Sequence, residues 1–395
     1  MKRLIITLLT VFAVFSIGTF LFMNTISALL QSEEITSELL PSFIESMMPK
    51  VILSIVIIII FVVLIILSLT KKKYKINLKE QTPSEKFDII YDSVYQNYIS
   101  ELEKQRKKVR LRTIIANILL IIVLIGHLMG RTGNLFISSE LNFIIVIASI
   151  IAFLLYIVVL LKNYTYKKEY EKAYKNNVLE EFIRLLNDKL IYKPDDIENA
   201  NNSRIAYQEA QFDDKVFNRY FADDYMEGYL DEETFVKMVD IDVKKVTGSG
   251  KNRHVEQIFD GLFAITTCNK DIETYIKITK DKRDFFGGKD RTNMDSEEFE
   301  KLFNVYSEDR ILAVRLLTSD IMNMLIDFYN KYKLTFEIVI RNNNIYLRFR
   351  TGAMFEPKIF GNSMDKELLY IYYCILEFVL QLTRQINKTI RELDI

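Results

Sequence analysis

The sequence contains little cysteine and little histidine, and it carries no net charge. Its 395 residues include two cysteines and two histidines, and 52 basic residues balance 52 acidic ones. Cys268 and Cys374 lie far apart, which fits free thiols in a reducing compartment better than a disulfide framework. Two histidines, His127 and His254, are too few for a multi-histidine metal centre. The balanced charge gives no overall basic field that would recruit nucleic acid.

Charged residues are also absent from four long apolar runs. We expect each run to form a membrane-spanning helix, because a helix rises about 1.5 Å per residue and the hydrocarbon layer is about 30 Å thick. The expected spans cover approximately residues 4–30, 51–70, 113–130 and 141–161. Asn117, Gly126 and His127 make the third run the weakest. The lack of Asp, Glu, Lys and Arg inside the runs argues against a coupled transporter or a charged-ion channel.

A basic segment lies between the second and third runs. Residues 71–112 hold twelve lysines and arginines, and such an excess beside membrane spans is retained on the cytoplasmic side. Four crossings of the cell membrane (inner or plasma membrane) then place both termini in the cytoplasm. Whether the first span is cleaved is left open. Part of the basic segment is a candidate for contact with anionic lipid headgroups, or is a topology signal alone. These residues are Arg106, Lys107, Lys108, Arg110 and Arg112.

The predicted fold is a multi-pass α-helical membrane region followed by a soluble α+β domain with an antiparallel sheet. Five parts are expected along the chain. They are a first transmembrane helix pair (1–70), a cytoplasmic basic helical segment (71–112), a second transmembrane pair (113–161), a helical stalk (162–190) and a cytoplasmic α+β domain (191–395).

Period-two alternation indicates the strands of the C-terminal half. Residues 234–246 and 255–267 alternate apolar and polar side chains, and residues 335–340 and 345–350 flank three asparagines, which tolerate the left-handed backbone of a hairpin turn. Residues 307–333 and 365–390 are expected to be long helices, and residues 192–203 a loop. Strands and helices in this order predict an antiparallel meander with covering helices.

No catalytic, cofactor or metal constellation stands out. Residues 248–251 resemble part of a phosphate loop, but the first glycine of the full pattern and the Mg²⁺-binding Ser or Thr are missing. Asp223 and Asp224 offer carboxylates without the spacing of an EF-hand. Gly261 within an apolar strand, with Phe259 and Phe263 beside it, indicates either a packing glycine or the wall of a groove. These five residues form the candidate binding surface.

Several blocks of the C-terminal half carry a resemblance to a known family. They are IFDGLFAITTCNK (258–270), EEFEKLFNVYSED (297–309), the NNIYLRF hairpin and the sequence MFEP (354–357). In this order the blocks resemble a family of bacterial membrane proteins known as the domain of unknown function number 3137, over approximately residues 164–360. The resemblance implies a hydrophobic hairpin ahead of a soluble domain, and it supplies no activity or catalytic residues. Two additional expected spans distinguish this chain.

Two classes of function are consistent with these features. The first is a non-catalytic membrane scaffold or sensor whose cytoplasmic α+β domain binds a protein, with membrane lipids as further partners and homo-oligomerisation left open. The alternative is a membrane-tethered enzyme that acts on a lipid or cell-envelope precursor through the acidic residues near Asp223. An enzyme predicts a pocket where Asp223 and Asp224 converge with another polar group, whereas a binding module predicts dispersed carboxylates and an exposed apolar edge.

Overall fold

A computed structural model describes residues 84–132, 139–213, 216–270, 272, 274–280 and 290–393. The chain divides into two units, and each is described by itself. The first comprises Met1–Lys72 and Arg112–Lys162, and the second comprises Lys73–Leu111 and Asn163–Ile395. The predicted spans at 4–30 and 51–70 lie outside the described residues.

Two long helices carry the described apolar runs. Helix α3 covers Glu85–Thr132 and helix α4 covers Ser139–Ala173. Within the described residues, one helical stretch, Phe143–Leu186, is long and apolar enough to cross a membrane, as judged by length and composition. The prediction of a multi-pass membrane region is therefore wrong for this part of the chain. The run at 113–130 is instead the end of a helix whose first half is charged, and the argument that placed the termini by counting four crossings no longer holds.

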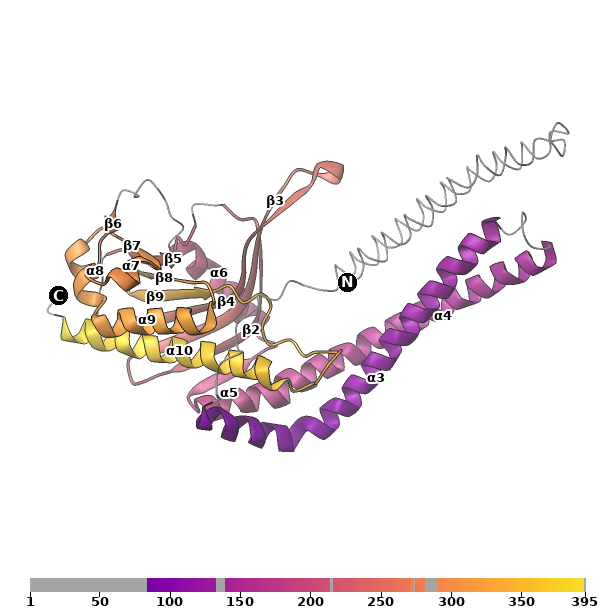
Figure 1. The fold of residues 1–395 in the computed structure, drawn as a ribbon, viewed down its shortest axis with the longest axis horizontal. Coiled ribbons are helices and arrows are strands. Elements are labelled where there is room, and N and C mark those ends of the chain that lie inside the picture. Colours follow the sequence, from indigo (N-terminus) through magenta and orange to yellow (C-terminus); the bar gives the residue numbers. More distant parts are fainter. Residues whose placement is uncertain are drawn as a thin grey trace. The chain divides into compact units, whose positions relative to one another are not determined.

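The second unit contains a nine-stranded sheet in the order β1-β2-β3-β4-β9-β8-β5-β7-β6 (Figure 1). Neighbouring strands pair antiparallel throughout. The strands are β1 (Leu190–Lys193), β2 (Arg219–Tyr229), β3 (Phe235–Thr247), β4 (His254–Thr267), β5 (Ile276–Lys280), β6 (Arg291–Thr292), β7 (Phe303–Ser307), β8 (Phe336–Arg341) and β9 (Asn344–Phe349). With its helices, this sheet forms an α+β domain.

Helical segments complete the second unit. A π-helix, η2 (Tyr174–Leu179), follows α4 directly, and the short 3-10 helix η3 (Gly250–Asn252) joins β3 to β4. The other helices are α5 (Glu180–Leu186), α6 (Ile197–Glu209), α7 (Glu297–Glu300), α8 (Arg310–Leu316), α9 (Ser319–Tyr332) and α10 (Lys366–Glu392).

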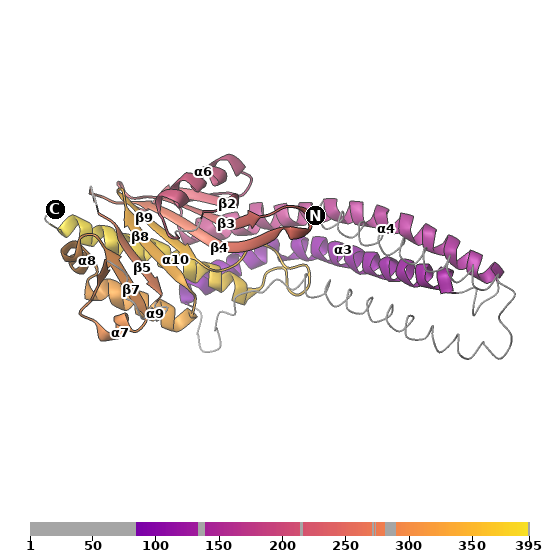
Figure 2. The same ribbon diagram turned by 90° about the horizontal axis from the view of Figure 1, so that it is seen from above.

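Both faces of the sheet are covered, because strand residues alternate between two hydrophobic clusters. Ile338 and Ile340 pack in the larger cluster with residues of α9 and α10, whereas Val339 between them packs in the smaller cluster with Tyr207 of α6. In Figure 2, α6 lies on one side of the strands and α9 and α10 lie across them. The Phe328 ring on α9 stacks on a ring of α10 with centroids 3.8 Å apart.

Local sequence signals explain the turns and two errors of prediction. Asn342 and Asn343 have positive φ angles, as expected for the two central residues of a tight hairpin turn. The expected helix at 307–333 is two helices, because Thr318 accepts a hydrogen bond from the Ile321 amide and begins α9 as its N-cap. The expected loop at 192–203 contains the start of α6, which Asp196 caps in the same way.

Candidate functional site

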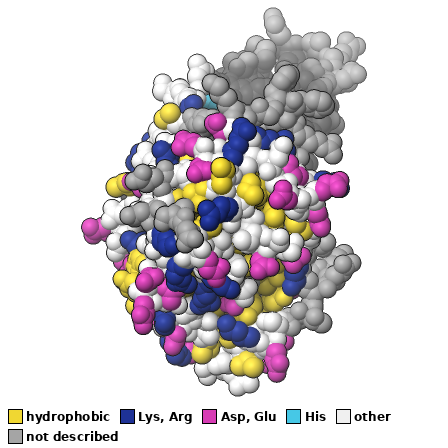
Figure 3. Space-filling model, turned by 90° about the vertical axis from the view of Figure 1, so that its left-hand side faces the viewer, with side chains coloured by type: hydrophobic (Ala, Val, Ile, Leu, Met, Phe, Trp, Pro, Cys, Tyr) yellow, Lys and Arg dark blue, Asp and Glu magenta, His cyan; other side chains and the backbone are white. Residues whose placement is uncertain are grey.

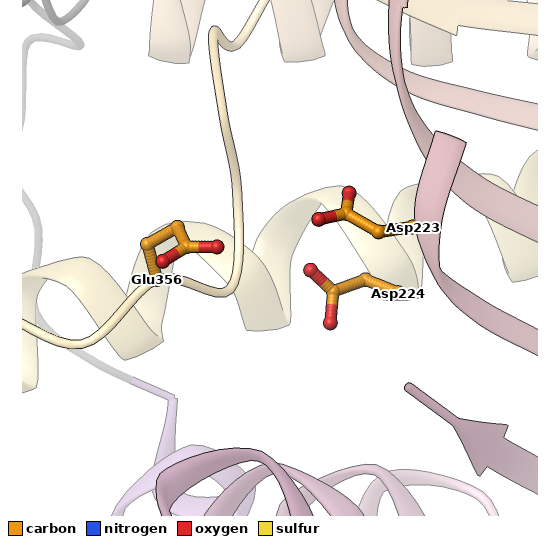
Figure 4. Close-up of side chains that lie close together, drawn as sticks. All are labelled: Asp223, Asp224 and Glu356. Carbon is orange, nitrogen blue, oxygen red and sulfur yellow. The ribbon is translucent and has the colours of Figure 1, made fainter. Parts of the chain in front are cut away.

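Asp223 and Asp224 lie together at an irregularity in strand β2. Successive side chains of a regular strand point to opposite faces of the sheet. Here the register shifts between Asp223, which pairs with Asp240 of β3, and Met226, and Asp224 adopts a φ of 53°. The bulge lets both carboxylates face the segment that follows β9, where Glu356 meets them (Figure 4). One carboxylate oxygen from each of these three residues lies within 4.8 Å of the other two.

Lys175 on the π-helix η2 supplies the positive charge at this site. Its Nζ lies 2.6 Å from Asp224 Oδ2, 3.5 Å from Glu356 Oε1 and 3.9 Å from Asp223 Oδ2. The Asp224 side chain is fully buried, and it also accepts a hydrogen bond from the Tyr192 hydroxyl. Three oxygen ligands in this arrangement suit a divalent cation, but the lysine ammonium already lies within 4 Å of all three carboxylates and offsets part of their charge.

A fourth carboxyl group, Asp240, completes the site. Asp240 faces Asp223 across the strand pair, and its side chain points to the face opposite Val239 and Ile241, which belong to the smaller cluster. The Met354 amide donates a hydrogen bond of 2.8 Å to Asp240 Oδ2. The other oxygen, Oδ1, is buried and has no hydrogen-bond partner among the described residues. We call Asp223, Asp224, Asp240, Glu356 and Lys175 the acidic cluster.

Three segments that contribute to the acidic cluster have unusual backbone geometry. Lys175 sits on a π-helix, Asp224 on a bulge with positive φ, and Phe355, beside Glu356, has a φ of 58°. Positive φ costs a residue other than glycine about 1–3 kcal/mol, and such strain and π-helical turns concentrate at functional sites. The coincidence of three such features at one place marks the acidic cluster as the candidate functional site of the domain.

Burial changes the protonation of the carboxyl groups. Desolvation raises the pKa of Asp224 from 3.8 to about 7, although the Lys175 ammonium acts in the opposite direction. Desolvation and the negative charge of Asp223 raise the pKa of Asp240 well above its ordinary value. The cluster therefore holds protons near neutral pH that isolated carboxyl groups would have released.

The protonation of Asp224 predicts a pH-dependent stability. Between pH 3.8 and about 7 the folded protein retains a proton that the unfolded chain has lost, so the free energy of unfolding falls as the pH rises through this window. The pKa difference corresponds to a few kcal/mol, at about 1.4 kcal/mol per unit. We expect Asp224→Asn to remove much of this slope in urea unfolding measured across the window.

A control for the pH experiment is Asp195→Asn. The Asp195 side chain is 75% exposed and pairs with the similarly exposed Lys172, so its replacement leaves the acidic cluster intact. Asp240 also contributes to the slope in the same direction, so Asp224→Asn reduces the slope without abolishing it. The same slope in the wild type and in Asp224→Asn would contradict the assignment.

The structure separates the other predicted surface residues from the two aspartates. Phe259 and Phe263 are fully buried in the smaller cluster, on the sheet face opposite Asp240. Gly261 has a φ of 144°, and a Cβ added there would lie 2.1 Å from the Phe349 carbonyl oxygen. These three residues thus belong to the core of the sheet, and the glycine is required by a close backbone approach.

The candidate headgroup residues on α3 divide into two groups. Arg106 is 6% exposed, bonds to Glu103 through two nitrogens at 2.8 and 2.7 Å, and donates to the Ile359 carbonyl at 3.2 Å. Lys107, Lys108 and Arg110 are exposed, and Arg112 is half-buried. Arg106 therefore links α3 to the segment around Ile359 inside the domain. Lys107, Lys108, Arg110 and Arg112 remain the candidates for lipid contact.

Sequence reasoning missed two charged residues that the fold brings into the interior. Lys175 lies in a charged stretch with no local sign of burial. Arg348 on β9 is 1% exposed and binds Asp213 at 2.5 Å and Glu337 at 2.5 Å on the side of the sheet that carries α6. Alternation along β9 could have indicated that Arg348 shares a face with Tyr346, but not which charges it meets.

Comparison with known proteins finds a family match within the C-terminal half of the chain. A family model described as Protein of unknown function (DUF3137) matches residues 257–388, which confirms the resemblance to that family over these residues. No curated protein matches the chain. Among solved structures, the crystal structure of the mycobacterial trehalose monomycolate transport factor A, TtfA, covers 44% of this chain and 75% of that chain, with 9% identity and a TM-score of 0.27. These values are too low to transfer a fold or a function.

Proposed function

We propose that this protein, whose residues 257–388 match that family, is a membrane-anchored, non-catalytic sensor with an α+β domain that binds a protein partner. The apolar part of α4 is the proposed anchor in the cell membrane. The basic excess at 71–112 favours the cytoplasmic side for the domain. The observation that carries the proposal is that residues 354–365, here called the connecting segment, bind both the acidic cluster and the two helices α3 and α4.

Side chains of the second unit's parts of α3 and α4 hold one end of the connecting segment. The Tyr91 and Tyr170 hydroxyls donate to the carbonyls of Met364 and Lys358 at 3.0 and 2.9 Å. Glu103 Oε1 accepts hydrogen bonds from the Ser363 amide at 3.1 Å and from the Ser363 hydroxyl at 2.6 Å. Hydrogen bonds from Arg106 and Ser363 hold the pKa of Glu103 at about 2, so the carboxylate accepts these bonds at any physiological pH.

The acidic cluster holds the other end. Met354 donates its amide to Asp240, and Glu356 lies 3.5 Å from Lys175. Lys175 follows α4 in the same helical run, beyond the apolar stretch. A shift of this run would move the ammonium relative to Asp224 and Glu356, and would change the connecting segment at the same time. An ionic contact shared by two segments is the kind of element through which two sites can be coupled.

The first half of β2 is the proposed partner surface. Strand β1 pairs with β2 only from Tyr225 to Gly228, so Arg219–Asp223 has a described neighbour, β3, on one side. Phe221 in this stretch is 57% exposed. An extended peptide could add to this edge by backbone hydrogen bonds. Asp223 ends the stretch and belongs to the acidic cluster. A change in the charge of the cluster would therefore change the electrostatic attraction of the bound peptide.

The geometry of the acidic cluster supports the alternative function, a membrane-tethered enzyme, less well than it supports a sensor. Asp223 and Asp224 do converge with a third polar group, as that alternative predicted. However, the Lys175 ammonium occupies the position between the carboxylates that a substrate or a catalytic cation would need. A cluster whose carboxylates already share an internal ammonium suits a switch better than a reaction centre.

Hydrogen exchange tests the coupling in the full chain, extracted from membranes in an uncharged detergent. Glu103→Gln weakens the anchoring of Ser363, and we expect faster exchange at the distant Met354 amide, which is bonded to Asp240. Loss of a hydrogen bond to a charged group costs about 1.5–3 kcal/mol, so the expected acceleration is on the order of tenfold.

The matched control is Glu181→Gln. Glu181 pairs with Arg184 three residues away at 2.7 Å, as Glu103 pairs with Arg106 at 2.7 Å, and the two glutamates are 21% and 23% exposed. Exchange at Met354 should be unchanged in this control. If Glu103→Gln also leaves Met354 unchanged, or if the protein is released from membranes by alkaline carbonate, the proposed function is wrong.

A further inference from the structure

A cavity of about 470 Å³ lies at one end of the sheet, between strand β6 and helix α8. Strand β6 is the last strand in the order of the sheet. Figure 3 looks onto this end of the domain, where basic side chains gather beside hydrophobic ones. The lining residues are Arg291, Thr292, Asn293, Arg310, Ile311, Val314 and Arg315.

Two polar side-chain atoms on β6, beside the cavity, are buried. Thr292 is 3% exposed, and its hydroxyl has no hydrogen-bond partner among the described residues. The Nε of Arg291 is likewise buried and unpartnered within the described part of the chain. Both atoms are closed off from solvent, so they border the cavity and do not reach a molecule bound in it.

Two further guanidinium groups line the cavity. Arg310 and Arg315 are exposed, and neither forms a hydrogen bond or ion pair with any residue that the structure describes. Arginine presents its donors in a planar fork that matches the oxygens of phosphate and carboxylate. Arg291 differs from these two, because its Nη2 lies 3.3 Å from Glu300 Oε2.

The charge balance selects the ligand class. Within the described part of the chain, three guanidinium groups against the single Glu300 carboxylate leave an excess of two positive charges, and the described lining residues include no Asp or Glu. A dianion therefore matches the cavity better than a single carboxylate does. Ile311, which is 74% exposed, and Val314, which is 39% exposed, add an apolar wall.

We propose that the cavity between β6 and α8 binds a phosphate monoester dianion that carries an apolar substituent. Arg310 and Arg315 bind the phosphate oxygens from α8, and Arg291 adds its positive charge from the sheet. Ile311 and Val314 contact the apolar substituent. Such a group can belong to a soluble phosphate ester or to the headgroup of a lipid with a terminal phosphate. This site is independent of the acidic cluster and of the connecting segment.

Calorimetric titration of the full chain in an uncharged detergent tests this proposal, with hexyl phosphate as the probe. We expect hexyl phosphate to bind more tightly than inorganic phosphate, which lacks the apolar part, and more tightly than hexyl sulfate, which carries one negative charge. Arg315→Gln and Arg310→Gln each remove a charged donor and should weaken binding about tenfold or more. Both side chains are exposed, so the variants should remain folded, which thermal unfolding checks.

The control variant is Arg384→Gln on α10, which lines a different cavity and should bind hexyl phosphate as the wild type does. Micelles that contain phosphatidic acid form the second arm. Competition with hexyl phosphate would assign the site to lipid headgroups, and its absence would assign it to soluble esters. Failure of the wild type to bind hexyl phosphate, or equal binding by Arg310→Gln, Arg315→Gln and wild type, would overturn the proposal.

Discussion

Replacing Lys175 by methionine is expected to lower the free energy of unfolding by about 3–5 kcal/mol in mildly alkaline buffer. The substitution keeps much of the side-chain volume but leaves the fully buried Asp224 carboxylate without its cation at 2.6 Å. Asp223 and Glu356 then add repulsion. Lys175 lowers the pKa of Asp224, so in the variant that pKa lies above about 7, and the loss should shrink as the pH falls towards 7 and Asp224 takes up a proton. Urea unfolding at several pH values measures both effects.

Two further variants show whether the loss comes from an unpaired charge. Lys172→Met, one helical turn earlier, removes a lysine that is 65% exposed and should change the stability by less than about 1 kcal/mol. The double variant Lys175→Met with Asp224→Asn should be more stable than Lys175→Met alone, because no charge remains buried at that position. Equal stabilities of the single and double variants would show that Lys175 contributes packing and not charge.

Gly261→Ala is expected to cause the second largest loss. The backbone at this residue has a φ of 144°, and the new Cβ would lie 2.1 Å from the Phe349 carbonyl oxygen and 2.7 Å from the Thr351 amide nitrogen. Backbone strain costs about 1–3 kcal/mol, and overpacking costs about 1–3 kcal/mol more. Both close atoms belong to the backbone, so the pairing of β4 with β9 must open to accommodate the methyl group. Chemical denaturation measures the difference.

The control for this substitution is Gly250→Ala in the turn between β3 and β4. Gly250 also has a positive φ, of 56°, but a Cβ added there meets no atom within 4 Å. The expected cost is about 1–2 kcal/mol, from the backbone conformation alone. A similar loss in both variants would mean that the close approach to Phe349 does not limit the packing of the sheet.

Local patterns were sufficient for the elements whose signals lie within a few residues. Alternation located β3 and β4, and the asparagines located the turn between β8 and β9. The pattern failed for β2, because its bulge interrupts the alternation that marks a strand. The apolar pattern also predicted one helix where the structure has α8 and α9. Thr318 before Ser319 and Asp320 is an N-cap signal that could have indicated the start of the second helix.

The candidate site divides in the same way. The sequence indicated Asp223 and Asp224 as candidates because their carboxylates are adjacent. Their partners come from η2, from β3 and from the segment after β9. No sequence spacing relates these segments, because long-range pairing depends on the register of the whole sheet. The same holds for Arg348, whose partners Asp213 and Glu337 become neighbours only when α6 and β8 are in place.

By itself, the sequence determined the apolar run of α4, the α+β character of the C-terminal half and the family that residues 257–388 match. These features are local, since a run of apolar residues or an alternation of side chains has the same meaning wherever it is placed. Only the tertiary structure decided which charges are buried and what neutralises them. Burial is a property of the assembled layers, and it turned Lys175 and four carboxyl groups from separate segments into one coupled site.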